Sequence, residues 1–481
     1  MKRHVLFICT DHWPGELLGA AGHPTIQTPT LDELARSGTR YTRAYSECPV
    51  CIPARRTIMT GTPPSVHGDR TFQDTLPMPD LPTVAQAFRD AGYQAYASGK
   101  LHVYPQRDRI GFDDVVLGEE GRGQYGVVDD YEQFLAEEGY PGEQFAHGMS
   151  NNQYVTRPWH LPEHCHNTYW TADQMIRLIK RRDPTRPGFW YLSFAHPHPP
   201  LTPPAAYLDI YRDAAIPEPT VGDWAADPNA LPFKLKKSHE YGRFLSSELR
   251  RAARRAFYAQ CTYIDHQIRR VIGTMREEGL LDDTVVLFTS DHGDMLGSHG
   301  LWAKRTFLEG SARVPMILAG APGRTPIPDN AADDRLVGQQ DIMPTLLELC
   351  GIPVPESVTG RPMVSAPRRE YLYGEEGEGV AATRMIHDGR HKLIYYAAGN
   401  VFHLFDLEVD PEERVNRADD PAYRDVRSAL TIRLLGELHG SDEEFVRDGL
   451  PVGLPEGEYE FHVRPGLFGQ RGGHWPPPPV T

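Results

Sequence analysis

Short, mostly apolar runs recur along the chain and are separated by stretches with helical spacing. The apolar runs cover residues 5–9, 93–97, 188–194 and 284–289. A run without alternation predicts a strand buried on both faces, as in the centre of a parallel sheet. Helical patterns cover residues 28–38, 81–92, 171–182 and 246–279. The chain therefore predicts buried parallel strands that are covered by helices.

The pattern changes after Pro367, where the apolar segments become shorter and lie closer together. We expect strands over residues 369–373, 381–387, 392–396 and 401–406, and a helix over residues 421–438. This predicts a main domain over residues 1–365, a small sheet-and-helix subdomain over 366–445, and a tail or arm over 446–481. Because the last segment contains Phe468 and Trp475, we favour an ordered arm that wraps a neighbouring subunit over a disordered tail.

Two long stretches, residues 105–165 and 203–240, show little periodicity and are expected to be irregular. The first is rich in Gly, acidic and aromatic residues, and we interpret it as loops over an active-site mouth that set specificity. Its cluster of histidines near Trp159 is consistent either with a zinc-binding tract or with a pocket wall.

Composition limits the classes of partner. The 481 residues carry a formal net charge of −15, which argues against broad binding to nucleic acids or anionic membranes. A small anionic substrate remains compatible, because it responds to a local basic pocket more than to distant charge. The six cysteines are few and scattered, as in a reduced cytoplasmic protein. The apolar run at residues 5–9 is too short for a signal-peptide core or a membrane span, so we expect a cytoplasmic location.

A carboxylate and an imidazole follow two of the predicted buried strands. Asp11 and His12 follow the first strand, and Asp291 and His292 follow the strand over residues 284–289. Open α/β sheets bind ligands at the C-terminal ends of their strands, and both residue types bind divalent metals. Considered alone, Asp11 and His12 fit a helix cap beside a surface histidine better.

Basic groups follow two further strands. Lys100 and His102 are two residues apart, so in an extended segment they point to the same side. Such a pair suits an anionic ester, because one group binds charge while the other moves protons. An ordinary basic loop has the same composition. His196 and His198 follow the strand over residues 188–194 and alternate with prolines, which hold the loop stiff.

The segment from Pro49 to Gly61 contains the most distinctive chemistry. A helix that begins near Pro53 puts Cys51 at its N-terminal end, where free N–H groups and the helix dipole favour negative charge. Arg55 adds a fixed positive charge. The alternatives are a structural cysteine or a Cys48-x-x-Cys51 redox or zinc pair, although the chain lacks the second Cys-x-x-Cys of a four-cysteine zinc site.

These motifs together resemble those of type I sulfatases, over residues 4–440. Cys51-x-Pro53-x-Arg55, with Thr60-Gly61 after it, resembles the family signature, and Ser290 to Gly300 resembles its second metal motif. Gly99-Lys100-x-His102, the turn that contains His198, and Lys304 match further motifs in the family order. The chain departs from the family at His12, where relatives have Asp or Gln, and at Asp69, near which many relatives have an Asn.

The resemblance implies a fold and a nucleophile. The expected fold is alkaline phosphatase-like α/β: a mixed, mostly parallel central sheet flanked by helices, with a smaller C-terminal antiparallel sheet plus helix. A partner, the formylglycine-generating enzyme, is expected to oxidise Cys51 to formylglycine, whose hydrate attacks the ester.

The resemblance also assigns roles to the other motif residues. Asp11, Asp291, His292 and the modified Cys51, together with His12 as an open position, are expected to hold one divalent metal. Arg55 is expected to orient the hydrate, Lys100 to bind substrate charge, and Lys304 and His198 to bind the oxyanion and assist the leaving group. His102 is expected to take the proton whose removal releases sulfate.

The leading hypothesis is a metal-dependent sulfate ester hydrolase. A phosphonate monoester hydrolase or phosphodiesterase with the same nucleophile is the alternative, favoured by the cytoplasmic expectation and by the imidazole-rich site. Ca²⁺, Mn²⁺, Zn²⁺ and Mg²⁺ are the candidate metals, and nitrogen ligands favour Mn²⁺ or Zn²⁺ over Ca²⁺. The third hypothesis is an inactive homologue that only binds. No nucleic-acid or membrane partner is expected, and assembly into a homo-oligomer is left open.

Overall fold

The computed structural model describes residues 3–121, 128–321, 323–461 and 470–471. Its centre is an eight-stranded sheet with the order β4-β3-β5-β1-β6-β7-β2-β8. Strand β7 is antiparallel to its neighbours β6 and β2, and the other adjacent pairs are parallel. The strands are β1 (His4–Asp11), β2 (Gly38–Tyr45), β3 (Gln94–Gly99), β4 (Asp114–Leu117), β5 (Gly188–Pro197), β6 (Thr284–Ser290), β7 (Met316–Ala319) and β8 (Ala331–Gly338).

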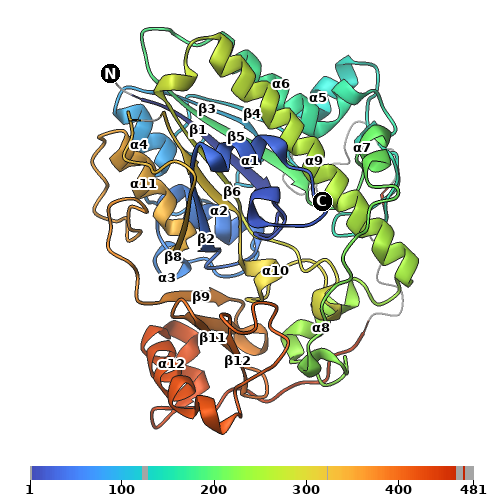
Figure 1. Ribbon diagram of the computed structural model, residues 1–481, viewed down its shortest axis with the longest axis vertical. Coiled ribbons are helices and arrows are strands. Elements are labelled where there is room, and N and C mark those ends of the chain that lie inside the picture. Colours follow the sequence, from blue (N-terminus) through green and yellow to red (C-terminus); the bar gives the residue numbers. More distant parts are fainter. Residues whose placement is uncertain (1–2, 122–127, 322, 462–469, 472–481) are drawn as a thin grey trace.

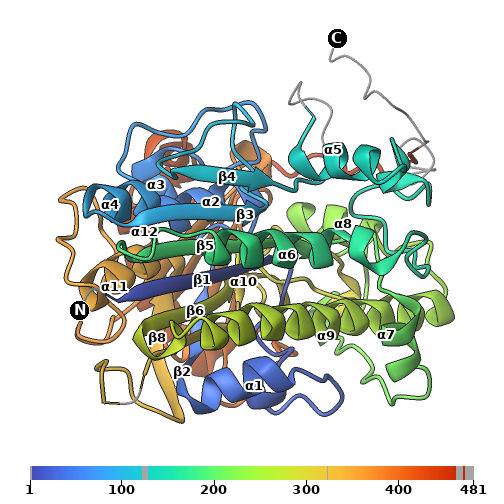
Figure 2. The same ribbon diagram turned by 90° about the horizontal axis from the view of Figure 1, so that it is seen from above.

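Helices cover both faces of this sheet (Figures 1 and 2). Along β1, Leu6 and Ile8 pack into a core with α1 (Pro29–Arg36), α6 (Asn167–Lys180) and α9 (Ser247–Glu277). Their neighbours Val5 and Phe7 point the other way, into a second core. This core is completed by α2 (Cys51–Thr60), α4 (Val84–Asp90) and α11 (Ile342–Leu349). Burial on both faces is the reason that β1 is a continuous apolar run.

A separate antiparallel sheet of four strands, in the order β12-β11-β10-β9, follows in the C-terminal part of the chain. Its Ile386 and Leu393 pack against Leu430 of α12. On the other face of this sheet, Met385 and Ile394 pack into a core that also contains residues of the main sheet. Both parts of the predicted fold class are confirmed. The elements are β9 (Leu372–Glu376), β10 (Thr383–His387), β11 (His391–Tyr396), β12 (Val401–Asp406) and α12 (Arg424–Glu437).

Several short elements were not expected from the sequence pattern. β9 begins three residues after the predicted position, and the two stretches expected to be irregular contain regular segments. Each of these elements covers eight residues or fewer, so a helical pattern repeats too few times to stand out, and β8 is partly or fully exposed over its first five residues, so it has no continuous apolar run. They are β4, α5 (Asp130–Glu137), α7 (Ala205–Ile210) and α8 (Phe233–Glu240), together with β7, β8, α3 (Pro64–His67) and α10 (Glu309–Ala312).

The described part of the C-terminal segment packs on its own chain. After the small hairpin of β13 (Val446–Arg447) and β14 (Leu450–Pro451), the Tyr459 hydroxyl donates to Glu240 of α8 at 2.9 Å. Further on, the backbone N–H of Arg471 donates to the Gly148 carbonyl at 3.0 Å. Phe468 and Trp475, on which the expectation of an ordered arm rested, lie outside the described residues.

Two simpler expectations can be compared with the structure. All six cysteines are free thiols, as expected, and five of them are buried. Within the described ranges, no helix combines the length and apolar character that a bilayer crossing requires.

The start of α1 depends on a carboxylate from another helix. Asp265 of α9 accepts the backbone N–H groups of Thr30 and Leu31 at 3.0 and 2.8 Å. Asp265→Ala is expected to lower the free energy of unfolding by about 1–3 kcal/mol, because it leaves both donors without this acceptor. Urea denaturation measures the change. Asp209→Ala, which removes an exposed ion pair with Arg212, is the control and should cost under about 0.5 kcal/mol. An equal effect of the two substitutions would contradict the capping role.

Candidate active site

Four neighbouring strands place their C-terminal ends at one edge of the sheet. Strands β3, β5, β1 and β6 are adjacent and parallel, so residues that follow them meet although they are far apart in sequence. Asp11 ends β1, while Lys100, His198 and Asp291 follow β3, β5 and β6. The sheet topology therefore brings the separate motifs to one place.

Cys51 is the first residue of α2, two residues earlier than the predicted start near Pro53. Its Sγ lies 3.2 Å from Nε2 of His292 and 3.7 Å from Oδ1 of Asp11, and the side chain is fully buried. Burial, followed by the negative charge of Asp11, raises the pKa of this thiol. The unmodified cysteine is therefore a neutral thiol, which is a poor nucleophile.

Side chains around Cys51 form a set of metal-ligand types. Donor atoms of Asp11, Cys51, Asp291 and His292 all lie within 4.8 Å of one another. Nδ1 of His292 is 2.9 Å from the Gly293 carbonyl, so it carries the proton and leaves the Nε2 lone pair facing Cys51 and Asp11. Two carboxylates and a neutral imidazole fit a divalent metal of the Mn²⁺ or Zn²⁺ type.

The pKa values of the two carboxylates are shifted in opposite directions. Burial alone would raise the pKa of Asp11, but the positive charges around it, above all Lys100, hold its pKa well below the usual value. Burial, and then the charge of Asp11, raise the pKa of Asp291. A cation between these buried carboxylates would relieve their repulsion, which is a further reason for placing the metal here.

Arg55 lies beneath this cluster. Its Nε donates to Oδ2 of Asp291 at 2.9 Å, and its Nη1 donates to the Lys100 carbonyl at 3.0 Å and to Ser193 Oγ at 2.9 Å. The guanidinium thus ties together residues that follow β3 and β6 with a side chain of β5. These contacts give Arg55 a positioning role in addition to the role that the family resemblance implies.

Two lysines and two imidazoles surround the cluster. Lys100 Nζ contacts Asp11 and Glu120, and Lys304 Nζ contacts His12 Nε2 and lies 3.1 Å from Nε2 of His198. Nδ1 of His198 is 2.6 Å from the Pro199 carbonyl, so Nε2 is the nitrogen that faces Lys304. Burial, and then the charge of Lys304, hold the pKa of His198 well below its usual value, so this imidazole is neutral.

His196, the other histidine that follows the strand over residues 188–194, lies outside this group. His196 is the penultimate residue of β5, and its Nδ1 is 3.1 Å from Thr168 Oγ1 on α6. His198 lies two residues further on, and the centroid of its ring is 4.2 Å from that of His12. Of these two histidines, His198 is therefore the one that faces the cluster.

Gly99 allows Lys100 to enter the site. It has φ +99°, and a Cβ at this position would lie 1.9 Å from the carbonyl oxygen of Ser193, so a side chain does not fit. His102 continues the same loop with φ +59°, donates its backbone N–H to Glu119 at 2.8 Å, and stands edge-on to Phe72. His102 belongs to neither metal-ligand group that involves Cys51 among the described residues.

The two departures from the family pattern have different outcomes. His12 faces the site: its Nε2 lies 3.8 Å from Asp11 Oδ1, and it belongs to a second ligand group with Asp11, Cys51 and His198. Asp69 instead pairs with Arg56 of α2 at 3.2 Å. That ion pair holds helix α2 and makes Asp69 part of the scaffold.

Three residues near the predicted ones were missed by the sequence analysis. Glu120 contacts Lys100 and lies 3.7 Å from His198, and Asp294 contacts both His12 and Tyr154. Asp294 lies inside the recognised motif from Ser290 to Gly300, which could have drawn attention to it. Glu120 and Tyr154 lie in the stretch without periodicity, and their positions depend on tertiary structure alone.

A small pocket of about 40 Å³ adjoins the site at Glu120 and His198, with Phe145 and Trp159 among its walls. This supports the expectation that residues 105–165 cover the mouth. His166, from the histidine-rich stretch, is buried and accepts the backbone N–H of Thr168 at the start of α6. His164, together with Glu138 and Cys165, forms a separate group of possible ligand atoms, but His164 and Glu138 are exposed, so the stretch fits a pocket wall and packing better than a closed zinc site.

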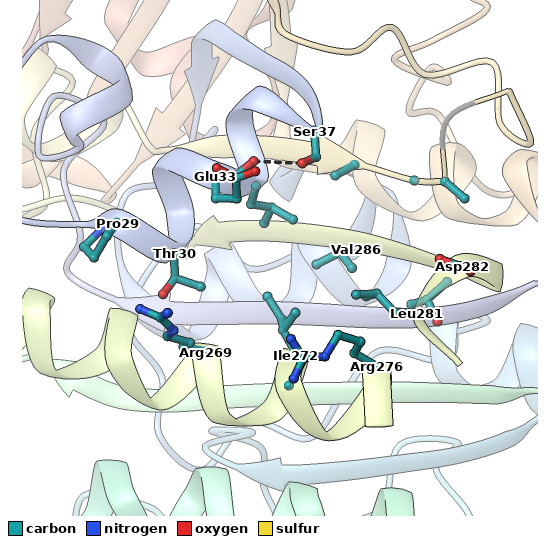
Figure 3. Close-up of a pocket in the computed structure, with 16 residues that line it drawn as sticks. Pro29, Thr30, Glu33, Ser37, Arg269, Ile272, Arg276, Leu281, Asp282 and Val286 are labelled. Atoms are coloured by element: carbon teal, nitrogen blue, oxygen red, sulfur yellow. Dashed lines mark hydrogen bonds between the residues drawn. The ribbon is translucent and has the colours of Figure 1, made fainter. Parts of the chain in front are cut away.

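A larger groove of about 750 Å³ lies elsewhere, between α1 and α9 (Figure 3). Thr30, Ile272 and Val286 are among its walls. Val286 is near the N-terminal end of β6, whereas Asp291 follows the C-terminal end. The groove is therefore separate from the Cys51 cluster.

Comparisons with known proteins agree with this geometry. A family model described as "Sulfatase" matches residues 3–352, and one described as "N-sulphoglucosamine sulphohydrolase, C-terminal" matches residues 297–439. An arylsulfatase of Clostridium perfringens is 34% identical, with 92% of this chain and 96% of that protein covered. A choline-sulfatase of Rhizobium meliloti is 32% identical over 89% and 86%. The solved phosphonate monoester hydrolase of Silicibacter pomeroyi has a TM-score of 0.76 at 25% identity, over 90% of this chain and 95% of that one.

Proposed function

The chain belongs to the sulfatase family, and from this premise we propose that it hydrolyses sulfate monoesters with a nucleophile made from Cys51. Its arylsulfatase and choline-sulfatase relatives support sulfuric ester hydrolysis. The observation that carries the proposal is the position of Cys51. It begins helix α2 within 3.7 Å of Asp11 and His292, at the edge where four parallel strands end.

Conversion of Cys51 to formylglycine is part of the proposal, with a formylglycine-generating enzyme as the maturation partner. The hydrated aldehyde supplies one hydroxyl that attacks sulfur and a second whose deprotonation releases sulfate. The neutral, buried state of the thiol supports this, because an unmodified Cys51 would be a weak nucleophile. His102, buried on the loop after β3, is proposed as the base for the release step.

The residues around Cys51 are arranged to bind an anion. Lys100 and Lys304 supply two positive charges, and the Nε2 of His198 is held toward Lys304 by the bond from Nδ1 to Pro199. We assign Lys100 to the ester oxygens and Lys304 to the leaving oxygen, with His198 orienting the Lys304 ammonium through the lone pair on its Nε2. Fixed donors in a buried site stabilise developing charge without reorganisation, which is the largest contribution in many hydrolases.

The proposed metal ligands are Asp11, Asp291, His292 and the side chain at position 51, with His12 as a further ligand. The ion would polarise the ester oxygens and lower the pKa of a bound hydroxyl. Arg55 keeps the ligand geometry fixed by holding Asp291 and the Lys100 loop. Because two of the ligands are imidazoles, we propose Mn²⁺ or Zn²⁺ ahead of Ca²⁺.

A second function has specific support. The Silicibacter pomeroyi phosphonate monoester hydrolase has the same fold over 90% of this chain, and the imidazole-rich site suits a phosphoryl centre as well as a sulfuryl one. Phosphonate monoester or phosphodiester hydrolysis is therefore the second candidate reaction. It uses the same side chains, so only relative rates separate the two functions.

The test begins with protein made together with an active maturation enzyme. The tryptic peptide of residues 44–55 should show an aldehyde mass at Cys51, and kcat/KM should be higher for 4-nitrophenyl sulfate than for phenyl phenylphosphonate. An intact thiol would reject the formylglycine step. A preference for the phosphonate would establish the second candidate, and turnover of neither ester would leave the binding homologue.

We also propose a cellular location and a seat for the leaving group. The six free thiols support a reducing, cytoplasmic setting. The pocket beside His198 and Glu120 is the proposed seat of the leaving group.

A further inference from the structure

Asp294 is a buried carboxylate whose oxygens are all occupied by protein donors. Oδ1 accepts the backbone N–H groups of Leu296 and Ala303 at 2.9 and 3.1 Å. Oδ2 lies 2.7 Å from Nδ1 of His12 and accepts the hydroxyl of Tyr154. With 1% of its surface exposed, Asp294 depends on these four groups in place of water.

This arrangement fixes the tautomer of His12. A carboxylate oxygen only accepts hydrogen bonds, so Nδ1 of His12 must carry the proton that points at Asp294. Nε2 is then the nitrogen with the lone pair, and it faces Lys304 and Asp11. In metal sites a ligating histidine donates its other N–H in this way to a carboxylate or a carbonyl.

His292 shows the same arrangement on the neighbouring strand. Its Nδ1 is directed to the Gly293 carbonyl and its Nε2 to Cys51, and its ring lies 4.6 Å from the ring of His12. The two imidazoles, from the ends of β1 and β6, thus present the same nitrogen toward one cluster. Both anchors are on the segment that follows β6.

The backbone around this contact is held in unfavourable conformations. His12 has φ +74°, and the two residues whose N–H groups bind Asp294, Leu296 and Ala303, have φ +46° and +62°. Residues with side chains seldom adopt such values, and they persist where surrounding contacts over-determine them. The Asp294 contacts are what holds His12 in this position.

Tyr154 extends the contact into the covering segment. Its side chain is 2% exposed, its hydroxyl bonds to Asp294, and its ring packs on Trp302 at 4.7 Å. Tyr154 therefore links the stretch that walls the mouth pocket to the residue that orients His12.

Resting on the proposed metal site, we propose that Tyr154 and Asp294 are positioning residues that hold His12 as a nitrogen ligand of the ion. They determine which nitrogen of His12 carries the proton and where the unprotonated nitrogen points. Asp11 and Asp291 supply the negative charge. The clamp of Tyr154, Asp294 and His12 makes the site prefer a transition metal over Ca²⁺, because Ca²⁺ gains little from an imidazole. The competing role for His12 is to accept a hydrogen bond from Lys304 without contacting the ion.

The test measures metal binding directly in mature protein with its formylglycine formed. Dissociation constants for Co²⁺ and Ca²⁺ are obtained by competition with a chelator, and the visible spectrum of the Co²⁺ form reports its nitrogen ligands. Asp294→Asn should weaken Co²⁺ binding about 10–100-fold and change the spectrum, and Tyr154→Phe should do so to a smaller extent. Ca²⁺ binding should change less than about threefold in both, because Ca²⁺ relies on oxygen ligands.

A double-mutant cycle separates action through His12 from a general disturbance. In a His12→Ala background, Asp294→Asn should have little further effect on the Co²⁺ dissociation constant, because the residue it positions is gone. Tyr211→Phe is the matched control, since it removes another buried hydroxyl, bonded to Thr262 at 2.6 Å and remote from the cluster. It should leave both dissociation constants unchanged.

Three results would overturn the proposal: Co²⁺ binding by both variants within twofold of the wild type, equal losses for Co²⁺ and Ca²⁺, or an undiminished effect of Asp294→Asn without His12. If Asp294→Asn does not fold, Tyr154→Phe decides alone, with its melting temperature compared with that of Tyr211→Phe. Wild-type protein that cleaves the aryl sulfate and binds Co²⁺, beside unaffected variants, would reject the clamp and retain the proposed function. Wild-type protein that binds no metal would reject both.

Discussion

Cys51→Ala is expected to lower kcat for an aryl sulfate by about 10⁴-fold or more, because removing a covalent nucleophile leaves only binding and electrostatic stabilisation. The substitution deletes one buried sulfur beside Asp11 and His292 and leaves the helix start in place. Initial rates with 4-nitrophenyl sulfate, measured on protein from the maturation host, give the comparison. KM should change far less than kcat, since Lys100 and Lys304 remain.

Cys48→Ala is the matched control for this experiment. Cys48 is also buried and lies three residues earlier, but its sulfur is directed to the Arg70 carbonyl, outside the cluster. Its loss should leave kcat within a few-fold of the wild type. If the two substitutions reduced kcat equally, Cys48 and Cys51 would act as a pair, and the redox or zinc interpretation would replace the formylglycine one.

Asp11→Asn is the second substitution with a large expected effect. Asp11 belongs to both ligand groups that contain Cys51 and contacts Lys100, so its charge serves the metal and the anion-binding lysine together. We expect metal affinity to fall about 100-fold and kcat/KM about 10²–10³-fold at micromolar metal. Metal content after gel filtration and rates across a metal titration measure the two effects.

Metal removal from the wild type provides the companion result. Dialysis against a chelator should abolish turnover, and Mn²⁺ or Zn²⁺ should restore it. Asp265→Asn is the control variant, because Asp265 is a buried carboxylate that binds backbone N–H groups of α1 and not the cluster. An Asp11→Asn protein with wild-type metal content and turnover would show that the ion, if any, binds elsewhere.

The sequence predicted the local structure well where elements are long. The apolar run at residues 5–9 became β1, and the helical spacing over residues 246–279 became α9 (Ser247–Glu277). A strand that is buried on both faces is apolar at nearly every position, and an amphipathic helix of this length repeats its apolar spacing many times. Strand β8 is as long as β1, but its first five residues are partly or fully exposed at the edge of the sheet, so it lacks a continuous apolar run. The helices α5 and α7 carry too few residues for a clear repeat.

The sequence also predicted only part of the candidate site. Motifs at strand ends and before α2 indicated Asp11, Cys51, Asp291 and the basic groups, because turn chemistry and family signatures are written in adjacent residues. The sequence could not place Glu120 beside Lys100 or Tyr154 beside Asp294. Glu120 and Tyr154 both lie in a stretch without periodicity, so no pattern indicated which residues they would contact.

The sequence by itself determined the kinds of chemistry present: a cysteine at a helix start, carboxylate–imidazole pairs and lysines at strand ends. Only the tertiary structure decided that β3, β5, β1 and β6 are neighbours, which makes one site of these groups. It also decided the direction of His12, because Asp294 fixes the proton on Nδ1. The physical reason is that short-range spacing encodes helix, strand and turn, whereas the order of strands in a sheet follows from packing among segments that are hundreds of residues apart.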